Sequence, residues 1–231
     1  GPVIGEGDVS NAQYALLGLK AAVRCGLKVD PEVWADSMDY FLRYQIPRGP
    51  AVKLARLKGL DKEGRPEFYS VPAVARGWSY AYGNLDEGGV NGGRACIGIS
   101  ALILCREELL KPAAGTAGAR ARSKAARIEE AIRDALAWLD ANFAVERNPG
   151  HPDYHHYYLY ALERAGVLTG SRYIGTHDWY REGAEFLLRN QNPDGSWPAQ
   201  GWSPETPNTC FALLFLKRST FPVVYTGGGG N

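Results

Sequence analysis

The 231-residue sequence predicts an all-α protein built from paired helices. Two kinds of segment alternate along it: short apolar segments with almost no charge, and amphipathic segments with one apolar stripe. The first kind is typical of helices buried on most faces, and the second of helices that pack on one side and meet water on the other. Hydrophobic residues make up 45% of the chain and charged residues 22%, which are ordinary values for a globular protein.

The apolar segments are the predicted inner helices. They cover residues 11–19, 91–99, 154–162 and 208–216. Three of them begin with asparagine, at Asn11, Asn91 and Asn208. Asparagine is a favoured N-cap because its side chain accepts a hydrogen bond from a free backbone N–H. We therefore expect these asparagines to start three of the four inner helices.

The amphipathic segments are the predicted outer helices, and they cover residues 34–45, 128–143 and 179–191. Their apolar residues recur at helical spacing, as Trp34, Met38 and Phe41 do in the first. An inner and an outer helix together occupy about fifty residues, close to the period of helical repeat proteins. Because one inner helix has no outer partner, we expect an open array with an exposed apolar end.

Two insertions interrupt this order, at about residues 46–77 and 111–124. Glycines and prolines break any long helix in the first. The second is rich in alanine, glycine and basic residues and has no acidic or aromatic residue, so we expect a solvated, mobile linker rather than a nucleic-acid surface. The chain as a whole balances 26 Lys and Arg against 25 Asp and Glu, which also argues against a nucleic-acid partner.

The two ends suggest that the chain, a single domain over residues 1–231, was cut from a longer protein. Gly1-Pro2 resembles the remnant of a protease site, and residues 226–231 form a glycine-rich tail. No apolar run reaches the roughly 18 residues that a membrane span needs, so no transmembrane segment is predicted. The sequence shows no signal segment and leaves the compartment open.

The cysteines are predicted to be free thiols. They are Cys25, Cys96, Cys105 and Cys210, and none of them forms a CxxC pair. Cysteine in apolar helices is usually a small buried hydrophobe. Pairing across the fold is the alternative.

Residues 181–197 contain the most specific local pattern. The last amphipathic segment ends at Gln191, a tight turn Asn192-Pro-Asp194-Gly195 follows, and Trp197 comes next. Proline fixes its own φ, aspartate bonds nearby backbone, and glycine tolerates positive φ. We expect the Gln191 side chain to bond backbone groups of the turn and Trp197 to fold back over the helix end.

This pattern resembles the QW motif of the squalene cyclase and protein prenyltransferase superfamily. Together with residues 10–19, 156–164 and 177–183, it makes residues 8–218 similar to the prenyltransferase/squalene-oxidase repeat proteins of bacteria, most of which have no assigned activity. The resemblance implies an (α/α) toroid or partial toroid, in which inner helices ring a central cavity and outer helices surround them. The motif is degraded elsewhere, since an insertion separates Gln45 from Trp78 and Asn142 replaces glutamine in the middle repeat.

The chemistries of this superfamily do not transfer to the sequence. The squalene–hopene cyclases protonate their substrate with an Asp-x-Asp-Asp motif, which is missing here. Protein prenyltransferases hold zinc through an Asp-x-Cys pair and a histidine. The nearest parallel begins at Asp8, and its histidine is replaced by Asn11, a poor zinc ligand. The resemblance therefore implies the repeat frame without either catalytic centre.

Two polar clusters remain as candidate sites. Asp153, His155 and His156 enter the third apolar segment, where they are suited to bind a divalent metal or to supply a general base. The alternative is that Asp153 caps the helix and the histidines pack. Asp86 and Glu87 lie in a glycine-rich stretch and are candidates for glycosidase-type catalysis with a third carboxylate. The alternative there is that the glycines allow close packing.

The function predicted first is a binding module, whose tyrosine- and tryptophan-lined surface holds a peptide, lipid or partner protein. The missing catalytic motifs favour it. The alternative is an enzyme acting on a terpenoid, prenyl or carbohydrate substrate through the residues of the two polar clusters. The missing part of the toroid, or a second copy of the chain, is a further expected partner because a repeat end is apolar.

Overall fold

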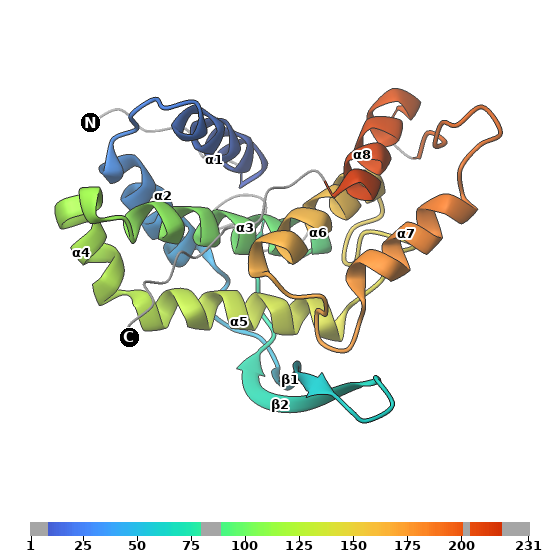
Figure 1. Ribbon diagram of the computed structural model, residues 1–231, viewed down its shortest axis with the longest axis horizontal. Helices are drawn as coiled ribbons and strands as arrows, with labels where there is room; N and C mark the ends of the chain where they lie inside the picture. Colours follow the sequence, from blue (N-terminus) through green and yellow to red (C-terminus); the bar gives the residue numbers. More distant parts are fainter. Residues whose placement is uncertain (1–8, 80–88, 201–203, 219–231) are drawn as a thin grey trace.

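The computed structural model describes residues 9–79, 89–200 and 204–218. Within them lie eight α-helices, one 3-10 helix and one two-stranded antiparallel sheet (Figure 1). The helices are α1 (Val9–Arg24), α2 (Pro31–Tyr44), α3 (Gly92–Leu109), α4 (Gly115–Ser123), α5 (Ala125–Ala141), α6 (His155–Thr169), α7 (Trp179–Arg189) and α8 (Glu205–Lys217), with the 3-10 helix η1 (Pro112–Ala114) and the strands β1 (Ala51–Leu60) and β2 (Pro66–Val74). The sheet makes the chain a mixed α and β protein, so the prediction of an all-α toroid is wrong.

Every predicted inner and outer segment is helical. The central helix α3 packs against α1 and α6, and α6 packs in turn against α8. The amphipathic helices α2 and α5 pack against α3, while α7 packs against α6. α3 is buried along almost its whole length, whereas α2, α5 and α7 are buried along one stripe. The difference in polarity between the two kinds of segment therefore matches their positions.

The predicted caps are correct for only one inner helix. Asn91 caps α3, and its Oδ1 accepts a hydrogen bond from the Arg94 N–H at 2.9 Å. α1 begins at Val9 and α8 follows Pro204, so Asn11 and Asn208 lie inside the first turns of these helices. The helices start earlier than the apolar runs do, because polar residues continue the helix beyond its buried stripe.

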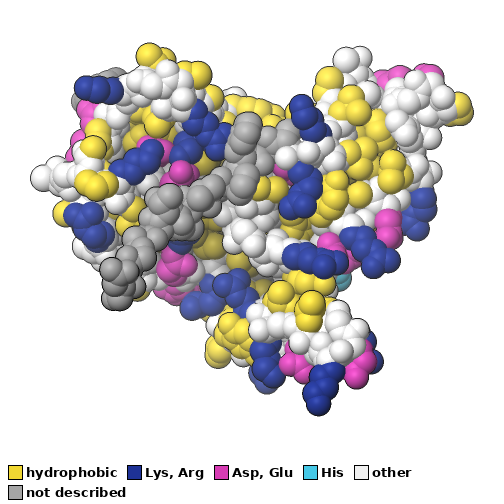
Figure 2. All heavy atoms as spheres, viewed as in Figure 1, with side chains coloured by type: hydrophobic (Ala, Val, Ile, Leu, Met, Phe, Trp, Pro, Cys, Tyr) yellow, Lys and Arg dark blue, Asp and Glu magenta, His cyan; other side chains and the backbone are white. Residues whose placement is uncertain are grey.

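The first insertion folds into the hairpin β1–β2, which projects from the body beneath α5 (Figures 1 and 2). Val52 lies opposite Ala73 and Leu54 opposite Val71. Residues opposite each other in an antiparallel pair share a face, so these four side chains form one apolar face. Leu54 and Ala73 are buried, and both strands contact α5.

A buried carboxylate on α5 anchors the base of the hairpin. Asp134 is fully buried, and its Oδ1 accepts a hydrogen bond from the Val74 N–H at 3.2 Å. Its Oδ2 pairs with the Arg76 Nε at 2.8 Å. The paired charge and the backbone bond together satisfy a group that would be costly to bury alone.

The C-terminal junction between repeats has the contacts expected of its turn. Gln191 Nε2 donates to the Gly195 carbonyl at 2.9 Å, and Asp194 Oδ1 accepts from the Ser196 N–H at 2.9 Å. These bonds from Ser196 lower the pKa of Asp194. Trp197 is buried over the end of α7, where its indole N–H donates to the Leu187 carbonyl at 2.9 Å.

The junction between α2 and α3 contains the same tryptophan hydrogen bond as the C-terminal junction, although the hairpin separates Gln45 from Trp78. Gln45 and Trp78 form a β-bridge, and the Ile46 N–H donates to the Gly77 carbonyl at 2.8 Å, so the ends of the insertion meet. The Trp78 indole N–H donates to the Phe41 carbonyl at 2.8 Å. Phe41 precedes Gln45 by the same interval as Leu187 precedes Gln191. The hairpin is therefore an insertion within a conserved kind of helix junction.

The second insertion is helical, so the prediction of a solvated linker is wrong. η1 and α4 occupy it, and α4 packs against α2. Ala117 and Ala121 are buried on one face of α4. Arg120 Nη2 pairs with Asp36 of α2 at 2.7 Å. Small apolar residues at helical spacing and complementary charge thus dock a segment whose composition resembles that of a linker.

An ion-pair cluster joins α1 to α3 and makes stability depend on pH. Lys20 Nζ lies 2.6 Å from Glu107 and 2.5 Å from Glu108, which also pairs with Lys111 at 2.6 Å. Burial acts to raise the pKa of Glu108, but the hydrogen bonds from Lys111 and Lys20 outweigh it and hold the pKa below its ordinary value.

A carboxyl group with a lowered folded pKa stabilises the protein above its unfolded pKa and loses that contribution as the pH falls through the folded value. Glu108→Gln is expected to lower the unfolding free energy by about 1–2 kcal/mol at pH 7. The difference from wild type should shrink as the pH falls below about 4.5, the unfolded range of glutamate. Urea unfolding between pH 7 and pH 3 measures it, and a difference that stays constant with pH would contradict this role.

Candidate functional site

One pocket lies where the N-terminal ends of the inner helices meet. It has a volume of about 460 Å³, and we call it the helix-start pocket. Its lining residues come from the first two turns of α1, α3 and α8 and from the approach to and first turn of α6. They are Ser10, Tyr14, Asn91, Gly93, Arg94, Ile97, Asn148, His151, Tyr154, Tyr157, Pro204, Pro207 and Phe211. Four separate segments of sequence therefore build one site.

Aromatic rings form one wall of the helix-start pocket. The Tyr14 and Tyr157 ring centroids are 6.3 Å apart, and those of Tyr157 and Phe211 are 5.5 Å apart. They come from α1, α6 and α8. Tyrosine offers an apolar ring with a polar tip, so this wall suits a ligand that is apolar along part of its length.

Arg94 is the one Lys, Arg, Asp or Glu among the described residues that line the helix-start pocket. Each helix N-terminus carries a partial positive charge, and the starts of four helices line the pocket. Arg94 adds a full charge, and its Nη1 donates to the Gly89 carbonyl at 3.0 Å, which positions the guanidinium beside the opening helix turn. None of the described residues that line the pocket is an aspartate or a glutamate. The lining therefore favours an anionic group.

A buried cation lies one layer beneath the aromatic wall. Arg164 of α6 is 1% exposed, and its Nη2 donates to Gln13 Oε1 at 2.9 Å. Its guanidinium lies 3.8 Å from the centroid of the Tyr160 ring, and Tyr160 stacks on the pocket residue Phe211 at 5.5 Å. Nε and Nη1 of Arg164 are buried and have no hydrogen-bond partner among the described residues. This charge strengthens the positive potential under the pocket.

His155 is held in place by the fold. Its Nε2 lies 2.7 Å from the Val145 carbonyl and its Nδ1 lies 3.1 Å from the Gln200 side-chain oxygen. Burial lowers the pKa of His155, although these hydrogen bonds oppose the shift, so the ring is neutral at pH 7. In a neutral ring, Nε2–H donates to the Val145 carbonyl and Nδ1 is an acceptor. Nδ1 then accepts from the Gln200 amide nitrogen, which requires the amide oxygen and nitrogen to exchange places. Both ring nitrogens are thus engaged within the protein.

The structure brings two of the three predicted cluster members together, because the ring centroids of His155 and His156 are 5.2 Å apart. His156 is 5% exposed, and burial, helped by the neighbouring His155, lowers its pKa to about 4. The Asp153 N–H donates to His151 Nδ1 at 3.1 Å. Over residues 9–79, 89–200 and 204–218, no group of three or more His, Cys, Asp or Glu side chains is placed to hold a metal ion. Asp153 does not cap α6 either, because Tyr154 occupies that position with φ of 59°.

The second candidate pair, Asp86 and Glu87, lies outside the described residues and stays a prediction. All four cysteines are free; Cys96 and Cys105 are buried, and burial raises the pKa of each thiol. Cys25 and Cys210 are exposed, so the expectation of burial holds for only half of them.

The helix-start pocket was not among the predicted sites, although all four segments that build it contain predicted inner helices. His151 and Tyr154, which flank the predicted cluster, line the helix-start pocket, whereas the cluster members do not. The repeat of inner and outer segments was the feature of the sequence that could have predicted this pocket. Helices in equivalent repeats run in the same direction, so their first turns gather at one end.

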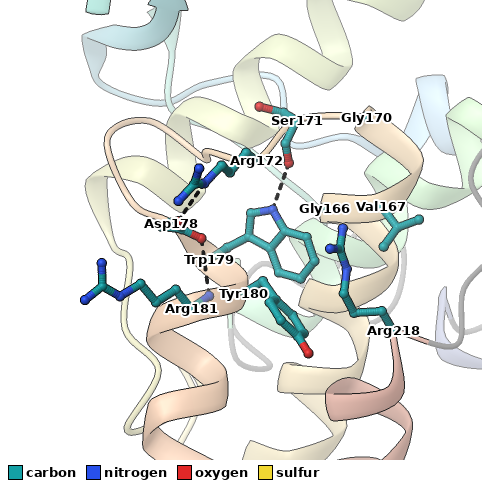
Figure 3. Close-up of a pocket in the computed structure, with 10 residues that line it drawn as sticks. All are labelled: Gly166, Val167, Gly170, Ser171, Arg172, Asp178, Trp179, Tyr180, Arg181 and Arg218. Atoms are coloured by element: carbon teal, nitrogen blue, oxygen red, sulfur yellow. Dashed lines mark hydrogen bonds and ion pairs between the residues drawn. The ribbon is translucent and has the colours of Figure 1, made fainter. Parts of the chain in front are cut away.

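A second cavity, of about 850 Å³, lies where α6 ends, α7 begins and α8 ends (Figure 3). We call it the arginine pocket because Arg172, Arg181 and Arg218 line it. Trp179 forms its buried centre, and its indole N–H donates to the Ser171 carbonyl at 2.8 Å. A Cβ at Gly166 would overlap the Trp179 ring, so glycine is required there for α7 to approach α6.

No protein-family model, curated protein or solved structure matches the chain. The resemblance to prenyltransferase/squalene-oxidase repeat proteins therefore stays a prediction. Among the described helices, none is both long enough and apolar enough to cross a membrane.

Proposed function

We propose that the chain is a binding module and that its ligand is an amphipathic organic anion held in the helix-start pocket. The observation that carries this proposal is the meeting of four helix starts and Arg94 around a pocket with no described carboxylate in its lining. The helix dipoles and the charge of Arg94 favour negative groups there, whereas the first N–H groups of α3 already donate to the Pro149 carbonyl, Asn148 Oδ1 and Asn91 Oδ1. The aromatic wall of Tyr14, Tyr157 and Phe211 accepts the apolar part of the same ligand.

Kinship with the prenyltransferase/squalene-oxidase repeat proteins is part of the proposal. Two junctions support it, because Trp78 and Trp197 each donate to the carbonyl four positions before a glutamine, Gln45 or Gln191. The neutral, internally bonded His155 favours a binding role over an enzymatic one for this part of the chain. The ligand class comes from the chemistry of the pocket lining.

Titration with 1-anilinonaphthalene-8-sulfonate, a fluorescent aromatic anion, tests the proposal. The wild-type chain is expected to bind one equivalent, and sodium dodecanoate should displace it. Arg94→Met keeps the apolar stem and removes the charge, and it should weaken binding about tenfold because it removes a charged hydrogen-bond donor. Phe211→Ala should weaken it about fivefold through lost ring contact.

Arg48→Met is the matched control, because Arg48 is exposed and lies outside the helix-start pocket. It should bind the probe as the wild type does. Equal affinities for Arg94→Met and Arg48→Met, or failure of dodecanoate to compete, would rule out the proposed ligand class. Circular dichroism of each variant shows that the helices are intact.

A further inference from the structure

Three arginines line the arginine pocket, and two of them form ion pairs within the chain: Arg181 with Glu185 and Arg172 with Asp178, each at 2.8 Å. The three arginines come from three different elements: Arg172 from the loop after α6, Arg181 from the first turn of α7, and Arg218 from the end of α8. Asp178 is the one carboxylate among the described residues that line it. Figure 2 shows basic side chains over the start of α7 and the neighbouring part of α6.

Arg218 is oriented by aromatic rings. Its guanidinium carbon lies 4.9 Å from the Tyr180 ring centroid and 5.7 Å from that of Trp179. No carboxylate among the described residues forms an ion pair with Arg218, which is exposed. A guanidinium held over rings by cation–π attraction keeps its N–H edge available to an anion. Arg218 is therefore positioned to receive a carboxylate from outside the chain.

Arg172 lies on the other side of the aromatic centre, as Figure 3 shows. Its Nε pairs with Asp178 Oδ2 at 2.8 Å, and Asp178 Oδ1 also accepts from the Arg181 N–H at 3.3 Å. Asp178 thus fixes the position of Arg172 while it caps α7. The guanidinium of Arg172 is exposed, and its terminal nitrogens point away from the bond to Asp178.

The separation of the two guanidinium groups selects an extended ligand. Arg172 and Arg218 flank Trp179 rather than converge on one point, so a single small anion cannot engage both (Figure 3). An extended chain that carries several negative groups can do so, and it would cross the centre of the pocket. Each carboxylate would then meet one planar guanidinium, which is the geometry that arginine favours.

The aromatic residues of the pocket discriminate against nucleic acid. Trp179 is 1% exposed and lies against Gly166. The Tyr180 ring stacks on Phe215 with centroids 5.7 Å apart, and its hydroxyl donates to the Leu216 carbonyl at 2.8 Å. Proteins that bind single strands offer ring faces on which bases stack, and here those faces are occupied. Because base stacking is blocked, an acidic peptide fits the pocket better than a single strand of nucleic acid does.

We propose that the arginine pocket docks an acidic peptide segment of a partner protein, with two of its carboxylates on Arg172 and Arg218. Fluorescein-labelled hexaglutamate is the probe, and its fluorescence anisotropy measures binding. The wild-type chain should bind it with an affinity that falls as salt rises, since the contacts are exposed charges. The double variant Arg172→Gln/Arg218→Gln should weaken binding at least tenfold, and each single variant should weaken it less.

Arg48→Gln removes one charge outside the pocket and is the matched control for the single variants. Arg94→Met should bind hexaglutamate as the wild type does. A loss of hexaglutamate binding therefore reports on the arginine pocket, and a loss of 1-anilinonaphthalene-8-sulfonate binding reports on the helix-start pocket. Unchanged binding by the double variant would overturn the proposal. Tighter binding of hexathymidylate than of hexaglutamate would identify a nucleic-acid surface instead. Displacement of hexaglutamate by inorganic phosphate at the same concentration of negative charge would identify a small-anion site.

Discussion

Replacing Trp78 with alanine is expected to lower the unfolding free energy by about 3–5 kcal/mol, the usual range for removing a large buried aromatic side chain. The Trp78 side chain is 0% exposed and meets the Phe41 ring edge-on at 6.2 Å. A Cβ at Gly98 would overlap its indole, so the ring fills the space between α2 and α3 that glycine leaves open. The substitution also removes the indole donor to the Phe41 carbonyl.

One further variant separates packing from hydrogen bonding, and a second is a control at an exposed position. Trp78→Phe keeps most of the ring volume and removes the donor, so it should cost less than Trp78→Ala. Leu60→Ala, at a hydrophobic residue that is 62% exposed, should change stability by less than about 0.5 kcal/mol. Urea denaturation with matched m-values measures all three. A loss for Trp78→Ala as small as that for Leu60→Ala would contradict a role for Trp78 at the centre of the junction.

The helices were predictable because burial and periodicity are local properties of sequence. α3 is apolar on all sides because helices cover it on all sides, and α7 is amphipathic because it packs on one side. The hairpin was missed although its pattern is present, since Val52 and Leu54 alternate with polar residues and the tight turn Asp61–Gly64 follows β1. Glycine and proline within residues 46–77 are also typical of loops, so the local composition and the alternation conflict.

The candidate site was less predictable because its residues come from four segments. Asp153, His155 and His156 stand together in the sequence, and the rings of His155 and His156 do lie 5.2 Å apart, but none of the three lines the helix-start pocket. His151 and Tyr154 reach the helix-start pocket, while His155 faces Val145 and Gln200. Which neighbours share a site depends on the arrangement of α1, α3, α6 and α8, and no local pattern contains that arrangement.

Excision of the hairpin is expected to leave a folded but weaker protein. Residues 46–77 would be replaced by Asn-Pro-Asp-Gly-Ser, the sequence that joins Gln191 to Trp197. The Ile46–Gly77 hydrogen bond shows that the ends of the insertion already meet, and both junctions make the same tryptophan bond. The helical circular dichroism signal and cooperative unfolding should therefore persist. The unfolding free energy should fall by about 3–5 kcal/mol, because removing buried side chains such as Leu54 uncovers α5.

Asp134 supplies the control for this experiment. In the full chain Asp134→Ala should cost about 2–3 kcal/mol, because Arg76 and the Val74 N–H lose their buried partner. In the excised chain the same substitution should cost much less, because Arg76 and the Val74 N–H are gone and the pair with Arg133 that remains, at 3.2 Å, is close to the surface. A double-mutant cycle of the two changes measures this coupling directly. Equal costs in the two backgrounds would show that Asp134 stabilises α5 independently of the hairpin, and loss of cooperative unfolding on excision would show that the hairpin is part of the helical core.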